Sequence, residues 1–169
     1  RHAPVTELVS LAKELGMESI IVDDGWRTDN LGRGYAYCGD WELARTKIPD
    51  MREVVDRVHA EGVKLILWFS VPFVGKYSRA FERFKDMCLK KREHIGASVL
   101  DPRYKEVRDF LVDIYTGYVK EYGWDGLKLD FIDSFSLSED SSTDYENMDT
   151  VSVEEGLQRL LSEAMEKLK

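Results

Sequence analysis

The segment DGLKLDF, residues 125–131, places a lysine and an aspartate two positions apart in an otherwise apolar run. Burying either charge is costly unless the charge is paired or used. Because side chains alternate along a strand, Lys128 and Asp130 are predicted to face one side, and Leu127 and Leu129 the other. A neighbouring ammonium favours the ionised carboxylate, which makes Asp130 a candidate nucleophile. A simple ion pair at a strand end is the alternative.

Other polar and aromatic residues occur where two further strands are predicted to end. Asp23, Asp24 and Trp26 follow the first strand, and Trp68 lies near the end of the second. Carboxylates accept paired hydrogen bonds from vicinal hydroxyls, and indole rings pack on the apolar faces of sugars. The set therefore favours a sugar ligand, for which an ionised Asp130 is a candidate nucleophile of retaining glycoside hydrolysis. Taken singly, the Asp-Gly step can be only a turn and Trp68 only a core residue.

Three segments that should position these residues share one pattern. Each has a polar helix end, a glycine suited to the left-handed position after a helix, and a run that is apolar on both faces. The glycines are Gly16, Gly62 and Gly123, and the runs are 18–23, 63–70 and 125–131. Such runs are typical of parallel strands covered by helices.

Helical periodicity fills the intervals between and after these strands. The predicted buried stripes are Leu8, Leu11, Ala12 and Leu15; Met51, Val54, Val55 and Val58; Val107, Phe110, Leu111, Ile114 and Tyr118; and Leu157, Leu160, Leu161, Ala164, Met165 and Leu168. The predicted caps are Asp50 with Glu53, Asp101 with Pro102 at the first helical position, and Ser152 with Glu155. A shorter helix is predicted at 78–90, with Phe81, Phe84 and Cys88 on one face. Long loops are predicted at 27–49, 71–78 and 133–151.

Alternating helices and strands predict an α/β fold with parallel strands and right-handed crossovers. A doubly wound sheet and a (β/α)8 TIM barrel both satisfy this order. No glycine-rich phosphate turn follows a strand, which weakens the nucleotide-binding sheet. A full barrel needs about 250 residues, whereas this chain has 169. We therefore predict one partial barrel domain over residues 1–169, truncated at both ends.

Composition narrows the classes of partner and compartment. The net charge is −8 with scattered basic residues, which disfavours nucleic acid. No apolar run approaches the roughly 20 residues that span a bilayer, so no membrane segment is predicted. Cys38 and Cys88 fit no metal or disulfide pattern and predict free thiols in a reducing, cytoplasmic compartment; secretion stays open. His2, His59 and His94 are predicted to be surface or structural residues.

Four motifs resemble the melibiase-type α-galactosidases of glycoside hydrolase families 27 and 36, and family 36 more closely. They are IVDDGW (21–26), GVKLILW with Pro72 (62–72), LDPRYKEVRDF (100–110) and DGLKLDF (125–131). The resemblance covers about residues 5–168 and keeps the order and spacing of the motifs. It implies a (β/α)8 catalytic domain, of which the three runs match barrel strands 2, 3 and 4, and hydrolysis of terminal α-galactosides with retention.

The resemblance also implies a role for each site residue. Asp130 matches the nucleophile and Lys128 the lysine that binds sugar hydroxyls. Asp23 and Asp24 match the aspartates that grip galactose through O4 and O6, and Trp26 closes their motif. Trp68 matches a tryptophan that lines the sugar pocket. No metal or organic cofactor is implied.

Two departures limit what the resemblance implies. The family often has an asparagine two residues after the nucleophile, whereas this chain has Ile132 there and Asp133 next. The family's general acid/base follows barrel strand 6, whereas the segments of this chain match strands 2 to 4. Retaining hydrolysis needs two carboxyl groups about 5–5.5 Å apart, so the chain alone is predicted to be inactive. Alternatives are galactosyl transfer, α-N-acetylgalactosaminide hydrolysis, a metal-dependent sugar isomerase using Asp23, Asp24, Asp130 and Asp133, and an inactive part-barrel scaffold. Exposed strand edges predict self-association into a homo-oligomer.

Overall fold

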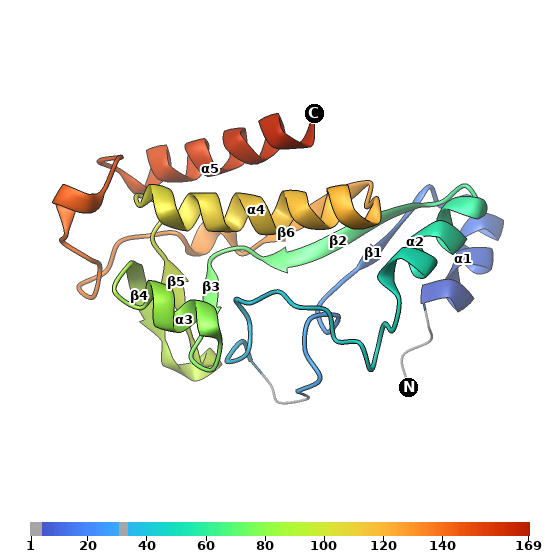
Figure 1. Cartoon of the computed structure of the whole chain (residues 1–169), viewed down its shortest axis with the longest axis horizontal. Helices are drawn as coiled ribbons and strands as arrows, with labels where there is room; N and C mark the ends of the chain where they lie inside the picture. The colour runs from blue at the N-terminus through green and yellow to red at the C-terminus, as the bar shows by residue number, and fades with distance from the viewer. Residues whose placement is uncertain (1–4, 31–33) are drawn as a thin grey trace.

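A three-stranded parallel sheet forms the centre of the computed structural model, which describes residues 5–30 and 34–169 (Figure 1). The strands are β1 (Ser19–Val22), β2 (Lys64–Ser70) and β6 (Gly126–Asp130), in the order β1-β2-β6. The register pairs Val22 with Leu67 and Trp68 with Lys128. The parallel strands of the predicted α/β fold are therefore confirmed, and their number and order fit part of a barrel.

Four longer helices accompany this sheet. They are α1 (Val5–Glu14), α2 (Met51–Ala60), α4 (Lys105–Tyr122) and α5 (Val153–Leu168). α1 and α2 pack together at one end, and α5 lies along α4 (Figure 1). Two predicted caps are confirmed, since Asp50 accepts a hydrogen bond from the Glu53 amide at 3.0 Å and Ser152 from the Glu155 amide at 3.1 Å. No helix in the described part of the chain is long and apolar enough to cross a membrane.

The three predicted glycines end their helices as expected. Gly16, Gly62 and Gly123 have φ angles of 71°, 75° and 80°. A side chain at such a φ is strained, so glycine suits the sharp change of direction from helix to strand.

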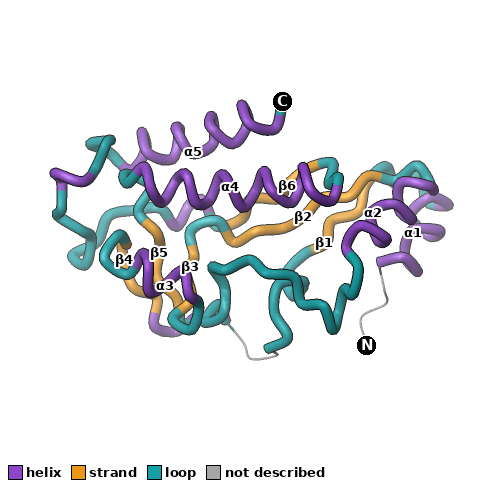
Figure 2. The backbone as a smooth tube through the Cα atoms, in the orientation of Figure 1, coloured by secondary structure: helices purple, strands orange, loops and turns teal. Residues whose placement is uncertain are grey.

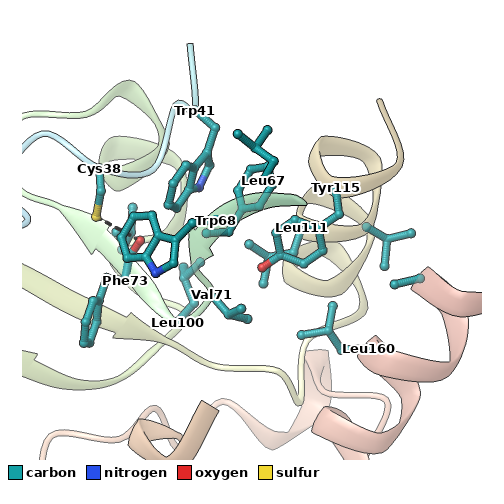
Figure 3. Close-up of a cluster of buried hydrophobic side chains, with 14 of the residues drawn as sticks. Cys38, Trp41, Leu67, Trp68, Val71, Phe73, Leu100, Leu111, Tyr115 and Leu160 are labelled. Atoms are coloured by element: carbon teal, nitrogen blue, oxygen red, sulfur yellow. Dashed lines mark hydrogen bonds between the residues drawn. The ribbon is translucent and has the colours of Figure 1, made fainter. Parts of the chain in front are cut away.

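The hydrophobic core lies between the sheet and the helices. Leu65, Leu67 and Phe69 of β2 are fully buried. Figure 3 shows Leu67 close to Leu111 and Tyr115 of α4, and the Phe69 and Tyr115 ring centroids are 5.1 Å apart. These side chains occupy one face of β2, which leaves the alternate positions, including Trp68, on the other face.

The predicted stripe of α1 is wrong in part. Ala12 is buried as predicted and Val9 joins it, but Leu8, Leu11 and Leu15 are exposed. α1 packs on α2 and β1, and only the Val9 and Ala12 part of its apolar face is covered. The sequence alone cannot say which side of such a helix is covered.

A second, antiparallel sheet replaces the predicted loop at 71–78 and the end of the helix at 78–90. It contains β3 (Phe73–Gly75), β4 (Cys88–Arg92) and β5 (Ala97–Leu100) in the order β3-β5-β4, with the short helix α3 (Arg79–Phe84) between β3 and β4. Cys88 therefore lies in a strand, although its thiol still contacts the Phe84 carbonyl at 3.2 Å. The pairing of β4 with β5 is non-local, and helical periodicity does not reveal it.

Helix α4 begins later than predicted. Asp101 and Pro102 were expected as cap and first helical residue, but the helix starts at Lys105. The Asp101 carboxylate instead accepts hydrogen bonds from the backbone amide of Arg103, at 3.0 Å, and from its guanidinium, at 2.7 Å. This buried ion pair uses the side chain that would otherwise cap the helix. The described residues also include three 3-10 turns: η1 (Glu93–Ile95), η2 (Ile132–Ser134) and η3 (Tyr145–Asn147).

The long loop between β1 and α2 crosses the sheet ends and packs against β3 (Figure 2). The Gly75 amide donates to the Cys38 carbonyl at 2.7 Å, and the Tyr77 amide to the Ala36 carbonyl at 2.9 Å. A Cβ atom on Gly75 would lie 2.3 Å from the Tyr35 carbonyl oxygen. Glycine at 75 thus permits the close approach that fixes Tyr35 beside the strand ends.

Candidate active site

The carboxyl ends of β1, β2 and β6 bring together four of the six predicted site residues: Asp23, Trp68, Lys128 and Asp130. The Lys128 ammonium lies 3.4 Å from Asp130 Oδ2 and 2.6 Å from Asp23 Oδ2. Lys128 and Asp130 therefore face the same side of β6, as alternation predicted. Two carboxylates from separate strands share one cation at the mouth of the sheet.

The Asp130 carboxylate is held by three donors. Trp68 Nε1 donates to Oδ2 at 2.9 Å, and the Phe131 amide donates to Oδ1 at 2.9 Å. The Trp68 hydrogen bond is the main cause that holds the pKa of Asp130 below its usual range, and the Phe131 amide and Lys128 act in the same direction against partial desolvation. Asp130 is thus kept ionised with its side chain 36% exposed, as a nucleophile requires.

Phe131 turns the chain immediately after Asp130. Its φ of 61° is left-handed, a conformation that costs a non-glycine residue about 1–3 kcal/mol. Its ring packs against Tyr35 at 5.5 Å, Trp68 at 6.5 Å and Phe73 at 5.0 Å between centroids. This aromatic packing stabilises the turn in which the Phe131 amide donates a hydrogen bond to Asp130.

Lys128 serves both acidic neighbours. The hydrogen bond to Asp23 is the main cause that raises the pKa of the Lys128 ammonium, with Asp130 contributing in the same direction. The group therefore stays charged around neutral pH. A cation in this position can offer further N–H donors to a hydroxylated ligand.

The two aspartates after β1 are fixed by their own turn. Asp23 Oδ1 accepts from the Asp24 amide at 2.8 Å, and Asp24 Oδ1 accepts from the Gly25 amide at 2.7 Å. Lys128 pairs with Asp23 and Asp130, whereas the ionic partner of Asp24 is Arg27, 3.2 Å from the same Oδ1. Both side chains remain exposed to solvent at the mouth of the site.

The two predicted tryptophans lie deeper than a sugar platform would. Trp26 is buried, and its Nε1 donates to the Trp68 carbonyl at 2.9 Å. Trp68 is also buried (Figure 3), and its ring stacks on Tyr35 at 6.2 Å. In this structure both indoles act on the site from beneath, through N–H groups and packing. Direct contact of either ring with a sugar stays a prediction.

Two residues near the site had no role in the sequence analysis. Arg27 lies behind Asp24, and Tyr35 packs over Trp68 and Phe131. The spacing of Asp24 and Arg27, three residues apart in a turn, was a usable signal for their ion pair. Nothing local points to Tyr35, whose position depends on the docking of its loop on β3.

The remaining candidates lie apart from the cluster. Asp133 acts electrostatically on Lys90, and His59 Nε2 lies 2.7 Å from Asp125 Oδ2, before β6. His2 falls outside the described residues. Across residues 5–30 and 34–169, no three His, Cys, Asp or Glu side chains gather closely enough to hold a metal ion. The Lys128 ammonium occupies the space between Asp23 and Asp130 where the isomerase alternative would need a cation.

Fold and site together define an α/β protein with a carboxylate cluster at the ends of parallel strands, of the kind found in glycoside hydrolases. The Melibiase family matches residues 2–165, and the chain belongs to that family. The chain is 31% identical over 134 residues to alpha-galactosidase Mel36A of Lactobacillus acidophilus, covering 74% of this chain and 17% of that protein. It is 30% identical over 118 residues to the bifunctional alpha-galactosidase/sucrose kinase AgaSK of Mediterraneibacter gnavus, which covers 63% of this chain and 12% of that protein.

Solved structures support the same fold. A variant of the family 36 alpha-galactosidase AgaA from Geobacillus stearothermophilus, in complex with stachyose, superposes with a TM-score of 0.79 at 20% identity, over 96% of this chain and 24% of that one. Another AgaA variant, in complex with raffinose, gives 0.76 at 21% identity, over 96% and 24%. The chain thus spans less than a quarter of these proteins.

Proposed function

We propose that this chain supplies the nucleophile and the galactose-binding side of a retaining α-galactosidase. Membership of the melibiase family and the sheet of parallel strands support a (β/α)8 barrel in which β1, β2 and β6 are strands 2, 3 and 4. Residues 1–169 then form one part of that catalytic domain. The observation that carries the proposal is the cluster in which Lys128 joins Asp23 to a firmly held Asp130.

Asp130 would act as the nucleophile. An oxygen of its ionised carboxylate attacks the anomeric carbon, and the bond from that carbon to the leaving-group oxygen breaks. A general acid outside residues 1–169 gives its proton to the leaving oxygen and later removes a proton from the water that hydrolyses the glycosyl-enzyme. Trp68, Phe131 and Lys128 lower the pKa of Asp130, so the attacking form is present without a separate base.

Asp23, Asp24 and Lys128 would bind the galactose hydroxyls. The carboxylates accept hydrogen bonds, and the ammonium donates them. Raffinose and stachyose, bound in the AgaA structures, indicate the class of substrate: oligosaccharides with a terminal α-linked galactose. Trp26 and Trp68 would support this site from the core. No organic cofactor is required by this chemistry.

A chimera tests the catalytic role. Residues 2–165 replace the matching segment of alpha-galactosidase Mel36A, and release of p-nitrophenol from its α-galactoside is followed. We expect the chimera to hydrolyse this substrate. Asp130→Asn should lower its kcat by on the order of 10³-fold or more, and the control Asp133→Asn should keep its activity. Equal rates for the chimera and its Asp130→Asn variant refute the proposal. The 169-residue chain alone is expected to give no turnover above background.

Binding by the chain itself is the second test, and it does not depend on folding of a chimera. In ¹H–¹⁵N NMR spectra, galactose is expected to shift the amides of residues 23–25 and 128–131, while glucose, its C4 epimer, has a weaker effect. Absence of any galactose-dependent shift refutes the proposed site. Product analysis with a second sugar as acceptor separates hydrolysis from galactosyl transfer.

Self-association is a second candidate property, favoured by a specific observation. Leu8 and Leu11 of α1 and Leu15, which directly follows it, are exposed, and together they make a larger apolar patch than isolated surface leucines. We expect the chain to sediment as a dimer or larger species at micromolar concentration, and the Leu11→Lys variant to shift toward the monomer. A concentration-independent monomer refutes this expectation.

A further inference from the structure

Arg27 is a buried arginine directly behind the exposed end of the site. Its side chain is 3% exposed, and its Cζ lies 5.7 Å from the Tyr35 ring centroid and 5.5 Å from that of Trp41. Its ionic partner is Asp24, 3.2 Å away, and its Nε has no hydrogen-bond partner among the described residues. The guanidinium is therefore desolvated but not fully satisfied.

Stability alone does not explain a cation at this position. Burying a guanidinium costs several kcal/mol, and a well-packed apolar side chain often serves the fold equally well. The two cation–π contacts offset only part of this cost. The single ion pair is weakened by solvent, because the Asp24 side chain is 41% exposed. An apolar residue between the rings of Tyr35 and Trp41 would fit the core as well.

What Arg27 does provide is a fixed orientation for Asp24. Oδ1 of Asp24 is held from two directions, by the Gly25 amide at 2.7 Å and by Arg27 Nη2 at 3.2 Å. Among the described residues, no donor reaches its Oδ2. Asp23 differs, because its two oxygens accept from the Asp24 amide and from Lys128. Asp24 is thus the aspartate with an oriented, unoccupied acceptor at the mouth of the site.

The surroundings keep Arg27 itself in place. Lys47 Nζ donates to the carbonyls of Gly25 at 2.8 Å and Thr28 at 2.6 Å, on either side of the arginine. Trp41 stacks on Trp26 at 5.9 Å, and its carbonyl accepts a hydrogen bond from Tyr118. Such support makes the Asp24 carboxylate preorganised and reduces the entropy lost when a ligand binds.

We propose that Arg27 is a positioning residue that orients Asp24 toward a substrate hydroxyl and so sets the preference for galactose over glucose. The inference rests on the proposed function of this site and names a residue that acts through Asp24. Arg27 itself touches no substrate.

A double-mutant cycle tests this coupling. Galactose and glucose affinities are measured by NMR titration for the wild-type chain, Asp24→Asn, Arg27→Met and the double variant. A hydrogen bond to a charged group is lost with Asp24→Asn, so we expect about tenfold weaker galactose binding. Arg27→Met should weaken it by about three- to tenfold and lower the galactose preference. The double variant should bind like Asp24→Asn alone, because the arginine then has nothing to orient.

Two further variants separate positioning from folding. Arg103→Met removes another buried arginine, paired with Asp101 and placed over the Tyr145 ring at 5.8 Å, and should leave galactose binding unchanged in the folded fraction. Arg27→Lys keeps the charge without the planar fork; we expect about two- to threefold weaker binding, and no added loss in the Asp24→Asn background. This variant decides the question if Arg27→Met does not fold.

The outcomes distinguish the two proposals. If the wild-type chain does not respond to galactose, the proposed function fails and takes this inference with it. If Asp24→Asn weakens galactose binding but the Arg27 variants bind like wild type, or add their loss to that of Asp24→Asn, only the positioning role is overturned. A galactose preference that falls equally in Arg103→Met overturns it as well.

Discussion

Replacing Trp68 with phenylalanine should raise the pKa of Asp130. The substitution keeps an aromatic ring but removes the indole N–H that donates to Asp130 Oδ2 at 2.9 Å. This hydrogen bond is the main cause of the lowered pKa of that carboxyl group. Without it, the Phe131 amide and Lys128 still lower the pKa against partial desolvation, so the pKa should rise toward its ordinary value.

The size of the change follows from the hydrogen bond and its exposure. A hydrogen bond to a charged group contributes about 1.5–3 kcal/mol to stability. Because the Asp130 side chain is 36% exposed, solvent screening reduces this figure, and we take about 1 kcal/mol. Trp68→Phe should therefore raise the pKa of Asp130, and the ionised carboxylate should lose about 1 kcal/mol of stabilisation.

The same change should appear in the pH dependence of stability. A carboxyl group whose folded pKa is depressed stabilises the fold above its unfolded pKa, about 3.9 for aspartate. That contribution is lost as the pH falls through the lower folded pKa. When the pH falls from 7 to below both pKa values, the free energy of unfolding of Trp68→Phe should therefore decrease by about 1 kcal/mol less than that of wild type. Loss of packing lowers its stability at every pH and does not affect this difference.

Carbon-13 NMR of the aspartate carboxyl groups measures the pKa directly, with Asp130→Asn identifying the signal. Trp124→Phe is the matched control, because Trp124 is also buried and its Nε1 has no hydrogen-bond partner among the described residues. Urea unfolding at several pH values gives the second readout. An unchanged pKa in a folded Trp68→Phe variant, or an equal rise in Trp124→Phe, refutes the assigned role of the indole.

Three further changes test other contacts. Lys128→Met should raise the pKa of Asp130 and weaken galactose binding, while leaving the urea midpoint nearly unchanged because the ammonium is exposed; carboxyl NMR and sugar titration check this. Gly75→Ala should lower the free energy of unfolding by about 2–3 kcal/mol through overpacking, whereas Gly117→Ala, with nothing within 4 Å of its added Cβ, should raise it by about 0.5–1 kcal/mol. Asp149→Asn leaves the buried Arg108 without its bidentate partner, whose oxygens lie at 2.7 and 2.9 Å. Urea unfolding at pH 7 should show a stability lower by about 2 kcal/mol, a cost reduced by the exposure of the carboxylate. Because Arg108 lowers the pKa of Asp149, the variant should also lose less stability than wild type as the pH falls.

Local patterns predicted the parts of the fold that local physics determines. The glycines after the helices and the caps at Asp50 and Ser152 depend on neighbouring residues, and the structure contains them. The parallel strands are visible in the sequence as apolar runs between helices, although their pairing is long-range. The antiparallel sheet depends on pairing between β4 and β5, which leaves little trace in a sequence with three consecutive basic residues in β4. The start of α4 was wrong because Asp101 forms an ion pair with Arg103 instead of a cap.

The site divides in the same way. Alternation along β6 was enough to place Lys128 and Asp130 on one face, where they meet at 3.4 Å. The spacing of Asp24 and Arg27 indicates their ion pair, but the contribution of Tyr35 could not be predicted, because it requires the loop after β1 to fold back on β3 and place the ring beside Phe131. The position of Tyr35 results from tertiary packing and not from any local preference.

The two strained backbone positions both lie beside the residues that hold the site carboxylates. Within the described ranges, only Trp41 and Phe131 are non-glycine residues with positive φ, at 54° and 61°. Each of these backbone conformations costs about 1–3 kcal/mol, and each residue helps to hold one carboxylate. The Phe131 amide donates a hydrogen bond to Asp130, and the Trp41 ring packs on Arg27, the ionic partner of Asp24. Both rings pack on Trp68, so one buried aromatic cluster offsets the strain at both positions. Core substitutions that loosen this cluster should therefore disturb the two carboxylates before they unfold the sheet.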